Sequence, residues 1–226
     1  MKKKGILLDL DNTLYEYTTP HNKGLNEVIS YCYIRFNIPS EEIKTAYSLG
    51  RQKVHIELSE TAASHNRLLY FQKMLEILKI PPFKYALKLY NLYWDTFLNN
   101  MKLHDGVIDF LDKYKGKICI VSDLTAHIQY KKIQKLKIES YIHSIVTSEE
   151  SGREKPHSYP FMLALQKLEL TSDNVFMIGD SFKKDIVGAL NMGIESFWIN
   201  DNEIKYIYNR NLVTEVKCFK EIFELI

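Results

Sequence analysis

Cysteine is scarce in this sequence. The chain of 226 residues contains three cysteines, Cys32, Cys119 and Cys218, and they lie far apart. Their spacing excludes a Cys-x-x-Cys site and a disulfide framework of the kind that staples small secreted domains. We therefore expect three buried thiols in a protein that works in a reducing compartment.

Long apolar runs are also absent. No run is long enough to cross a bilayer as a helix, so no membrane partner is expected. The segment Lys2-Lys3-Lys4 precedes an apolar run, but this run stops at Asp9 and is too short for the hydrophobic region of a signal peptide. A cytoplasmic location is the resulting expectation.

An excess of charge of either sign is missing as well. The formal net charge is only +2, which gives no indication of nucleic acid or anionic membrane as a partner. A small anionic substrate would have to be attracted by local charge. With 46% hydrophobic residues, the chain can bury a substantial core, as one domain or two small ones.

The stretch from Lys4 to Tyr15 carries the strongest local signal. Its apolar run ends in two aspartates, Asp9 and Asp11, which are separated by one residue. This pattern predicts a buried parallel strand with acidic groups at its carboxyl end. Because side chains alternate along a strand, both carboxylates are expected on the same side.

Three later segments have features that suit the same place. Ser122 and Asp123 end a second apolar run, Lys155 with Pro156 precedes a helix, and a third run ends in Gly179-Asp180-Ser181, followed by Asp185. Asp180 and Asp185 lie where a predicted strand passes into a helix. Their hard oxygen atoms suit Mg²⁺.

Strand and helix patterns alternate from about residue 104 to the C-terminus. The predicted strands are residues 117–121, 142–146, 174–178, 196–199 and 212–216, and the predicted helices are 108–114, 126–136, 161–168, 185–191 and 219–225. Such alternation predicts an α/β fold with a doubly wound parallel sheet, whose ligands bind at the carboxyl ends of the strands.

Residues 16–103 have a helical pattern instead. Four helices are predicted there. One covers residues 21–36, two have Ser40 and Ser64 as their N-cap residues, and the last follows Pro81-Pro82. We expect residues 1–15 and 104–226 to form the catalytic core, and residues 16–103 to form a helical-bundle cap domain inserted over the site.

The four segments, in this order, resemble the four motifs of the haloacid dehalogenase-like hydrolase superfamily. The resemblance implies a Rossmann-like core with a helical cap inserted between the first and second motifs. It also implies a magnesium-dependent phosphatase that works through an aspartyl-phosphate intermediate.

The resemblance also assigns roles to the acidic residues. Asp9 would be the nucleophile, and Asp11 would protonate the leaving group and then activate water. The metal ligands would be Asp9, Asp180 and Asp185, together with the backbone carbonyl of Asp11. Without a cation, these carboxylates would repel one another and the substrate phosphate.

The remaining motif residues would bind phosphate. Lys155 would keep Asp9 ionised and bind phosphate oxygens, and Ser122 and Thr13 would donate their hydroxyls. Asp123 stands where the superfamily often has Asn. A further carboxylate there would be unfavourable unless it points away from the phosphate or meets a cation.

The substrate is expected to be a small phosphorylated metabolite: a sugar phosphate, a sugar-acid phosphate or a nucleotide. Arg51, His55 and Arg67 are candidate contacts from the cap to its nonreacting part. A phosphomutase of the same fold, a 2-haloacid dehalogenase and a catalytically silent interaction protein are the alternatives. Dehalogenases of the superfamily lack an aspartate at the position of Asp11, which favours phosphoryl transfer. We expect a monomer or a homodimer.

Overall fold

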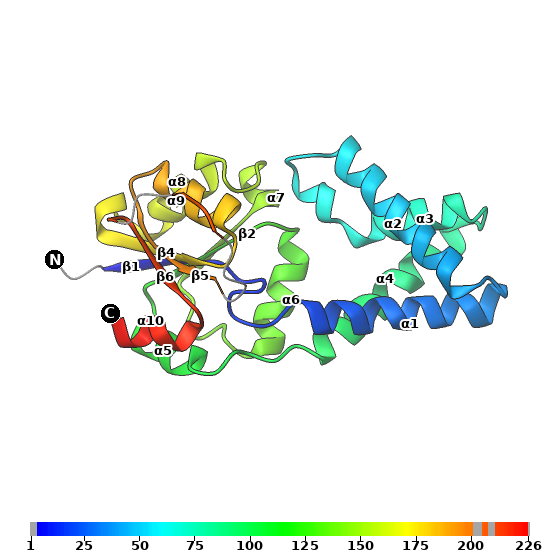
Figure 1. The fold of residues 1–226 in the computed structure, drawn as a ribbon, viewed down its shortest axis with the longest axis horizontal. Helices are drawn as coiled ribbons and strands as arrows, with labels where there is room; N and C mark the ends of the chain where they lie inside the picture. The colour runs from blue at the N-terminus through cyan, green and yellow to red at the C-terminus, as the bar shows by residue number, and fades with distance from the viewer. Residues whose placement is uncertain (1–3, 201–204, 208–210, 226) are drawn as a thin grey trace. The chain divides into compact units, whose positions relative to one another are not determined.

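The computed structural model describes residues 4–200, 205–207 and 211–225 (Figure 1). Lys2 and Lys3, considered above for a signal peptide, lie outside these residues. Contacts between Cα atoms divide the chain into a core unit, residues 1–16 with 102–226, and a helical unit, residues 17–101. These units end close to the predicted domain boundaries, and their independence as domains stays a prediction.

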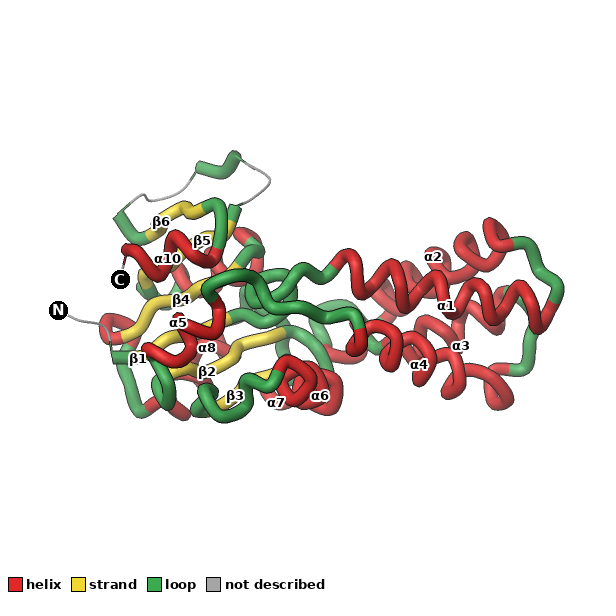
Figure 2. The backbone as a smooth tube through the Cα atoms, turned by 90° about the horizontal axis from the view of Figure 1, so that it is seen from below, coloured by secondary structure: helices red, strands yellow, loops and turns green. Residues whose placement is uncertain are grey.

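A parallel sheet forms the centre of the core unit. In the described residues it has six strands in the order β3-β2-β1-β4-β5-β6, and every pair of neighbours is parallel (Figure 2). The strands are β1 (Gly5–Leu8), β2 (Ile118–Ser122), β3 (Ser144–Thr147), β4 (Val175–Gly179), β5 (Glu195–Ile199) and β6 (Val213–Val216). The predicted α/β class with a parallel sheet is confirmed.

Helices cover both faces of this sheet. They are α5 (Val107–Lys113), α6 (Ala126–Leu136), α7 (Ser148–Ser151), α8 (Ser158–Leu168), α9 (Val187–Leu190) and α10 (Phe219–Leu225). Figure 1 shows α8 and α9 on one face and α5 with α10 on the other. This is the doubly wound arrangement that the alternation of strands and helices predicts.

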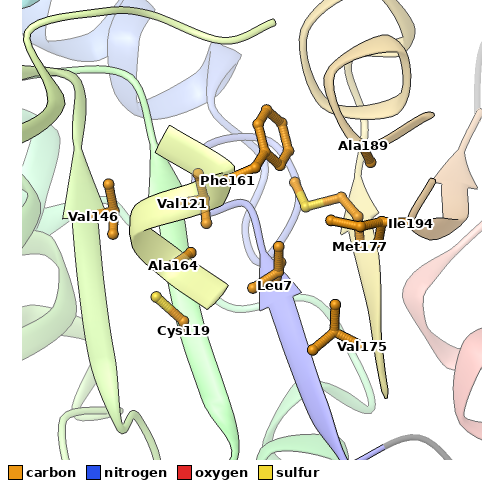
Figure 3. Packing of buried hydrophobic residues seen from close by; sticks show 10 residues of the cluster. All are labelled: Leu7, Cys119, Val121, Val146, Phe161, Ala164, Val175, Met177, Ala189 and Ile194. Carbon is orange, nitrogen blue, oxygen red and sulfur yellow. The ribbon is translucent and has the colours of Figure 1, made fainter. Parts of the chain in front are cut away.

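The core under α8 explains why the first strand is so apolar. Leu7 of β1 and Met177 of β4 belong to one fully buried cluster with Phe161 and Ala164 of α8 (Figure 3). Burying a side chain the size of Phe161 contributes about 2 to 3 kcal/mol. β1 is hydrogen-bonded to β2 on one side and to β4 on the other. The position of its carboxyl end is therefore tightly fixed.

The strand order places a switch point between β1 and β4. From β1 the chain builds the sheet in one direction through β2 and β3, and then in the other through β4, β5 and β6. Ligands of open parallel sheets bind at such a point, outside the carboxyl ends of the strands. Asp9 follows β1 and Asp180 follows β4, so both aspartates lie at this point.

The helical unit contains four helices in its described residues, which are all of residues 17–101. They are α1 (Thr18–Phe36), α2 (Ser40–Glu57), α3 (Arg67–Ile77) and α4 (Pro82–Asn99), with a 3₁₀ turn at Ala62–His65. Pro82 occupies the first turn of α4, where its missing N–H costs nothing. None of the helices in the part of the chain that the structure describes is long and apolar enough to span a membrane.

Four local predictions were wrong. Ser40 is the first residue of α2 and not its N-cap; the N-cap position is Pro39, whose side chain makes no capping hydrogen bond. Ser64 does not cap α3; it lies in the 3₁₀ turn, and the side chain of Asn66 accepts the hydrogen bond from the Leu68 N–H at 2.9 Å. The predicted helix 185–191 is a π-helical turn, Phe182–Ile186, followed by α9. Cys218 is exposed, whereas Cys32 and Cys119 are buried as expected.

Candidate active site

Asp9 directly follows β1 and is almost completely buried, with 5% of its surface exposed. Its Oδ1 accepts a hydrogen bond from Lys155 Nζ at 2.6 Å, and its Oδ2 accepts one from the Thr13 hydroxyl at 3.0 Å. Burial raises the pKa of Asp9 to about 7; the Lys155 ammonium lowers it, and the Asp185 carboxylate raises it. Near neutral pH this carboxyl group therefore titrates, and added positive charge would favour its ionised, nucleophilic form.

Lys155 connects two of the predicted acidic residues. Its ammonium lies 2.6 Å from Asp9 Oδ1, 2.6 Å from Asp185 Oδ1 and 2.8 Å from the carbonyl oxygen of Val121. Burial opposes the charged form of Lys155, but the carboxylates of Asp185 and Asp9 raise its pKa well above the ordinary value. The site thus contains a permanently charged ammonium group in contact with the candidate nucleophile.

Asp180 and Asp185 come from the segment after β4. Asp180 accepts a hydrogen bond from the Asn12 side chain at 3.0 Å, and its backbone N–H donates to the Thr13 hydroxyl at 3.1 Å. Asp185 is 1% exposed and accepts a hydrogen bond from the Ser181 N–H at 3.0 Å. Burial, reinforced for Asp180 by Asp9 and for Asp185 by Asp180, raises both pKa values to about 6.

Gly179 makes room for this arrangement. A Cβ atom at position 179 would lie 2.4 Å from Asp185 Oδ2, far inside normal contact distance. Any larger residue would therefore displace the Asp185 carboxylate. The glycine at the end of β4 is required by the close approach of an acidic side chain.

The residues present fit a hard divalent cation. Asp9, Asp180 and Asp185 each offer a carboxylate oxygen, and these atoms lie within 4.8 Å of one another. Carboxylate oxygens suit ions such as Mg²⁺. Burial, and after it the neighbouring carboxylates, raise the pKa of each of the three groups, and a bound cation would favour their ionised forms. The side chain of Asp11 is outside this group, and the predicted role of its backbone carbonyl stays a prediction.

Asp11 has a separate set of partners. Lys132 Nζ lies 2.5 Å from Asp11 Oδ1 and 2.7 Å from Oδ2, and Tyr15 donates its hydroxyl to Oδ1. Gln129 Nε2 lies 3.3 Å from Oδ2. The pKa of Asp11 is lowered, because Lys132 and the hydrogen bonds outweigh the opposing effect of burial. Each of the two carboxylates after β1 thus has its own buried lysine.

Ser122 and Asp123 lie at the end of β2. The Ser122 hydroxyl is buried and accepts a hydrogen bond from Gln129 Nε2 at 2.6 Å. Asp123 Oδ1 accepts a hydrogen bond from the Lys155 N–H at 2.9 Å, and its Oδ2 lies 2.8 Å from Lys184 Nζ. The extra carboxylate therefore meets a cation, which is one of the two conditions set out for it.

The three candidate substrate contacts of the helical unit differ in their exposure and in their hydrogen-bond partners. Arg51 is exposed, and His55 is half-buried with its Nε2 2.8 Å from the Tyr70 hydroxyl. Arg67 is 7% exposed and donates to the hydroxyls of Tyr17 and Tyr93 and to the carbonyl of His65. Its guanidinium carbon also lies 5.0 Å from the centre of the Tyr70 ring. Whether these residues contact substrate stays a prediction.

Lys132, Gln129 and Lys184 were missed by the sequence analysis. A signal for the first two exists: Gln129 and Lys132 occupy the buried stripe of α6 with Ile133 and Leu136, at spacings of three, four and seven. A lysine in an apolar stripe needs a buried anionic partner. The sequence does not show which anion this is.

Comparisons with known proteins find one matching family and several similar phosphatases. The family described as haloacid dehalogenase-like hydrolase matches residues 6–199. The chain is 34% identical to ribulose-1,5-bisphosphate 5-phosphatase of Halopiger xanaduensis over 88% of this chain and 85% of the relative. It is 25% identical to human N-acylneuraminate-9-phosphatase over 89% of this chain and 84% of the relative.

A solved structure shows the same fold. The HAD-hydrolase YfnB of Bacillus subtilis, crystallised with magnesium, superposes with a TM-score of 0.76 and 20% sequence identity. The match covers 100% of this chain and 99% of the other. At this level of identity the similarity concerns the fold.

Proposed function

The chain belongs to the haloacid dehalogenase-like hydrolase family, and we propose that it is a magnesium-dependent phosphatase of small phosphomonoesters. The observation that carries the proposal is the environment of Asp9. A buried carboxylate lies against the Lys155 ammonium and within a cluster of carboxylates that suits a cation. Uncatalysed phosphomonoester hydrolysis is extremely slow, so an enzyme needs this combination of a nucleophile and concentrated positive charge.

In the first half-reaction, a carboxylate oxygen of Asp9 attacks phosphorus. The new bond joins phosphorus to Asp9, and the bond from phosphorus to the leaving oxygen breaks. Lys132 lowers the pKa of Asp11 in the free site, and the negative charge of a bound phosphate would raise it, so that Asp11 carries a proton in the substrate complex. Asp11 gives this proton to the leaving oxygen, which departs as an alcohol. Lys155 and the Ser122 hydroxyl bind the phosphoryl oxygens, where negative charge is concentrated.

In the second half-reaction, Asp11 takes a proton from water as the water oxygen attacks phosphorus. The bond between phosphorus and Asp9 breaks, inorganic phosphate leaves, and Asp11 is protonated again. Bound to Asp9, Asp180, Asp185 and the Asp11 carbonyl, Mg²⁺ would supply positive charge that offsets the carboxylates and the phosphate. Asn12 and Thr13 contribute by holding Asp180 and Asp9 in place.

The proposed substrate is a phosphorylated sugar or a close relative of one. This proposal is supported by the names of the relatives, which include phosphatases of ribulose bisphosphate, N-acylneuraminate 9-phosphate and glyceraldehyde 3-phosphate. Sugar-acid phosphates and nucleotides remain within the proposed class. Arg51, His55 and Arg67 are proposed to contribute to the choice among them. We further propose that the enzyme acts in the cytoplasm as a monomer or homodimer.

The experiment is phosphate release from a panel of sugar phosphates, sugar-acid phosphates, nucleotides and p-nitrophenyl phosphate, with magnesium and with excess EDTA. The proposal expects release that depends on magnesium and is lost in Asp9→Asn. A phosphomutase would give an isomerised sugar phosphate with little free phosphate, and a dehalogenase would release halide from 2-haloacids. Absence of phosphate release from every compound would overturn the proposal.

A further inference from the structure

We propose that Lys132 is a positioning residue that holds the carboxylate of Asp11 in the orientation from which it transfers protons. This inference rests on the proposed function, in which Asp11 serves as acid in one half-reaction and base in the other. Lys132 is outside the four motifs. It acts through Asp11 and is not itself expected to touch the substrate.

The contact between Lys132 and Asp11 involves both carboxylate oxygens. The Lys132 ammonium lies 2.5 Å from Oδ1 and 2.7 Å from Oδ2 of Asp11. The Lys132 side chain is completely buried, whereas 21% of the Asp11 side chain is exposed. Asp11 is thus held on its buried side and remains accessible on the other, as a group that exchanges protons with a substrate must be.

Two further residues restrict rotation of this carboxylate. The Tyr15 hydroxyl donates to Oδ1, and Gln129 Nε2 lies 3.3 Å from Oδ2. Gln129 and Lys132 are three residues apart on α6, so their side chains leave the same face of the helix. Gln129 Nε2 is also 2.6 Å from the Ser122 hydroxyl. Gln129 therefore contacts both Asp11 and the serine that is proposed to bind phosphate.

Packing alone does not account for a lysine at position 132. The neighbouring buried positions of α6 are Ile128, Ile133 and Leu136, and a methionine would fill similar space without desolvating a charge. Removing a lysine ammonium from water is unfavourable unless a well-placed anion compensates it. The arrangement therefore indicates a use for a fixed charge beside Asp11.

A purely structural role is the alternative, in which the ion pair only joins α6 to the loop after β1. The two roles differ in their dependence on the leaving group. The p-nitrophenolate ion is a weak base and departs without a proton, whereas an alkoxide requires one. The value of kcat/KM covers the steps up to transfer of the phosphoryl group to Asp9, so it isolates this requirement.

The test compares Lys132→Met with Lys131→Met, a matched loss of charge at the adjacent, half-buried position of the same helix. For Lys132→Met we expect kcat/KM to fall about 100-fold with glycerol 3-phosphate and less than about threefold with p-nitrophenyl phosphate. Lys132→Arg keeps the charge and should recover much of the activity with glycerol 3-phosphate. Lys131→Met should match the wild type with both substrates.

A double variant keeps the test decisive if Lys132→Met folds poorly. In Asp11→Asn/Lys132→Met neither member of the pair is charged, so no buried charge lacks a partner. If Lys132 acts through Asp11, adding Lys132→Met to Asp11→Asn should cause no further loss with glycerol 3-phosphate. An equal loss in both backgrounds, or equal losses with both substrates in Lys132→Met, would overturn the inference.

Failure of the proposed function gives a different result. If the wild type cleaves neither these compounds nor any in the panel, the proposed function falls, and this inference falls with it. If the wild type cleaves them and Lys132→Met behaves like Lys131→Met, only the role of Lys132 is overturned.

Discussion

The ammonium of Lys184 lies 2.8 Å from Asp123 Oδ2, and this contact gives the carboxylate after β2 a cation of its own. The other oxygen of Asp123 accepts a hydrogen bond from the backbone N–H of Lys155 at 2.9 Å. Asp123 therefore anchors the loop that presents Lys155, while Lys184 offsets its charge. Under these conditions an acidic residue is tolerable beside Ser122, the serine proposed to bind phosphate.

Replacement of Lys184 by methionine tests this relationship. Without the ammonium, Asp123 should repel the substrate phosphate, and kcat/KM for phosphomonoesters should fall about fivefold, equivalent to about 1 kcal/mol for a partly exposed pair. Asp123→Asn in the same chain should restore most of the loss, because the amide keeps the hydrogen bond to Lys155. A loss that persists in the double variant would show that Lys184 acts in another way.

Asp9→Asn should reduce turnover at least about a thousandfold, because an amide is a poor nucleophile of nearly the same size. The fold should persist, and in metal-free protein at pH 8 the melting temperature should be unchanged or higher. The reason is that one of three mutually repelling carboxylates has been removed. Circular dichroism and phosphate release from the preferred substrate measure both effects; near-normal turnover would remove Asp9 from the role of nucleophile.

Magnesium should stabilise the protein more at high pH than at low pH. In the metal-free protein, the pKa of Asp9 is raised to about 7 and those of Asp180 and Asp185 to about 6, against 3.8 for an ordinary aspartate. The folded state thus holds extra protons between about pH 4 and pH 7, and the contribution of these groups to the free energy of unfolding falls as pH rises through that range. A cation needs the ionised carboxylates, so its stabilising effect should grow over the same range.

Thermal unfolding with excess magnesium and with EDTA measures this difference. We expect the melting temperature to rise by about 5 °C or more at pH 8 and by much less at pH 5. Asp180→Asn should remove most of the rise at pH 8, which serves as the control for specific binding. A shift of equal size at both pH values would contradict an acidic site of this kind.

Arg51 and Arg67 should respond differently to replacement by alanine. Arg67 is buried against the Tyr70 ring and holds two tyrosine hydroxyls, so its loss should lower the melting temperature by roughly 4 to 12 °C. Arg51 is exposed, and its loss should leave the melting temperature within about 1 °C.

Substrate choice provides the second measurement for these arginines. If Arg51 contributes to it, Arg51→Ala should lower kcat/KM for the preferred substrate by about 1 to 3 kcal/mol and hardly affect p-nitrophenyl phosphate. Wild-type behaviour of Arg51→Ala with every compound in the panel would remove Arg51 from the proposal. Equal losses with both substrates in Arg67→Ala would indicate disturbed packing in the helical unit.

The parallel sheet, and the position of the motif residues at one edge of it, could be predicted because each strand is recognisable from a short stretch of sequence. A buried parallel strand is a short apolar run, and Asp9, Ser122 and Asp180 each stand at the end of one. Parallel strands bring such ends to the same edge of the sheet, so residues far apart in sequence can be expected together. The chemical roles of these residues stay predictions.

The lysines that pair with the motif carboxylates could not be predicted, because tertiary structure determines which residues form these ion pairs. Lys132 and Asp11 are 121 residues apart, and Lys184 and Asp123 are 61 apart. A helical stripe shows that Lys132 is buried, but the identity of its partner depends on where α6 packs. Asn66 replaced Ser64 as the cap of α3 for a local reason: both residues can cap a helix, and the sequence does not decide between them.

The central position of β1 has a consequence for biosynthesis. β1 leaves the ribosome before the other strands of the sheet. Its hydrogen-bonding partners are β2, more than a hundred residues later, and β4, which begins at Val175. At about 5 to 20 residues per second, synthesis from Asp9 to Asp185 takes roughly ten to thirty-five seconds. For most of that interval the apolar strand β1 lacks its second neighbour, β4, because β4 has not yet been synthesised. The nascent chain can therefore have no complete active site until most of the core unit has been translated.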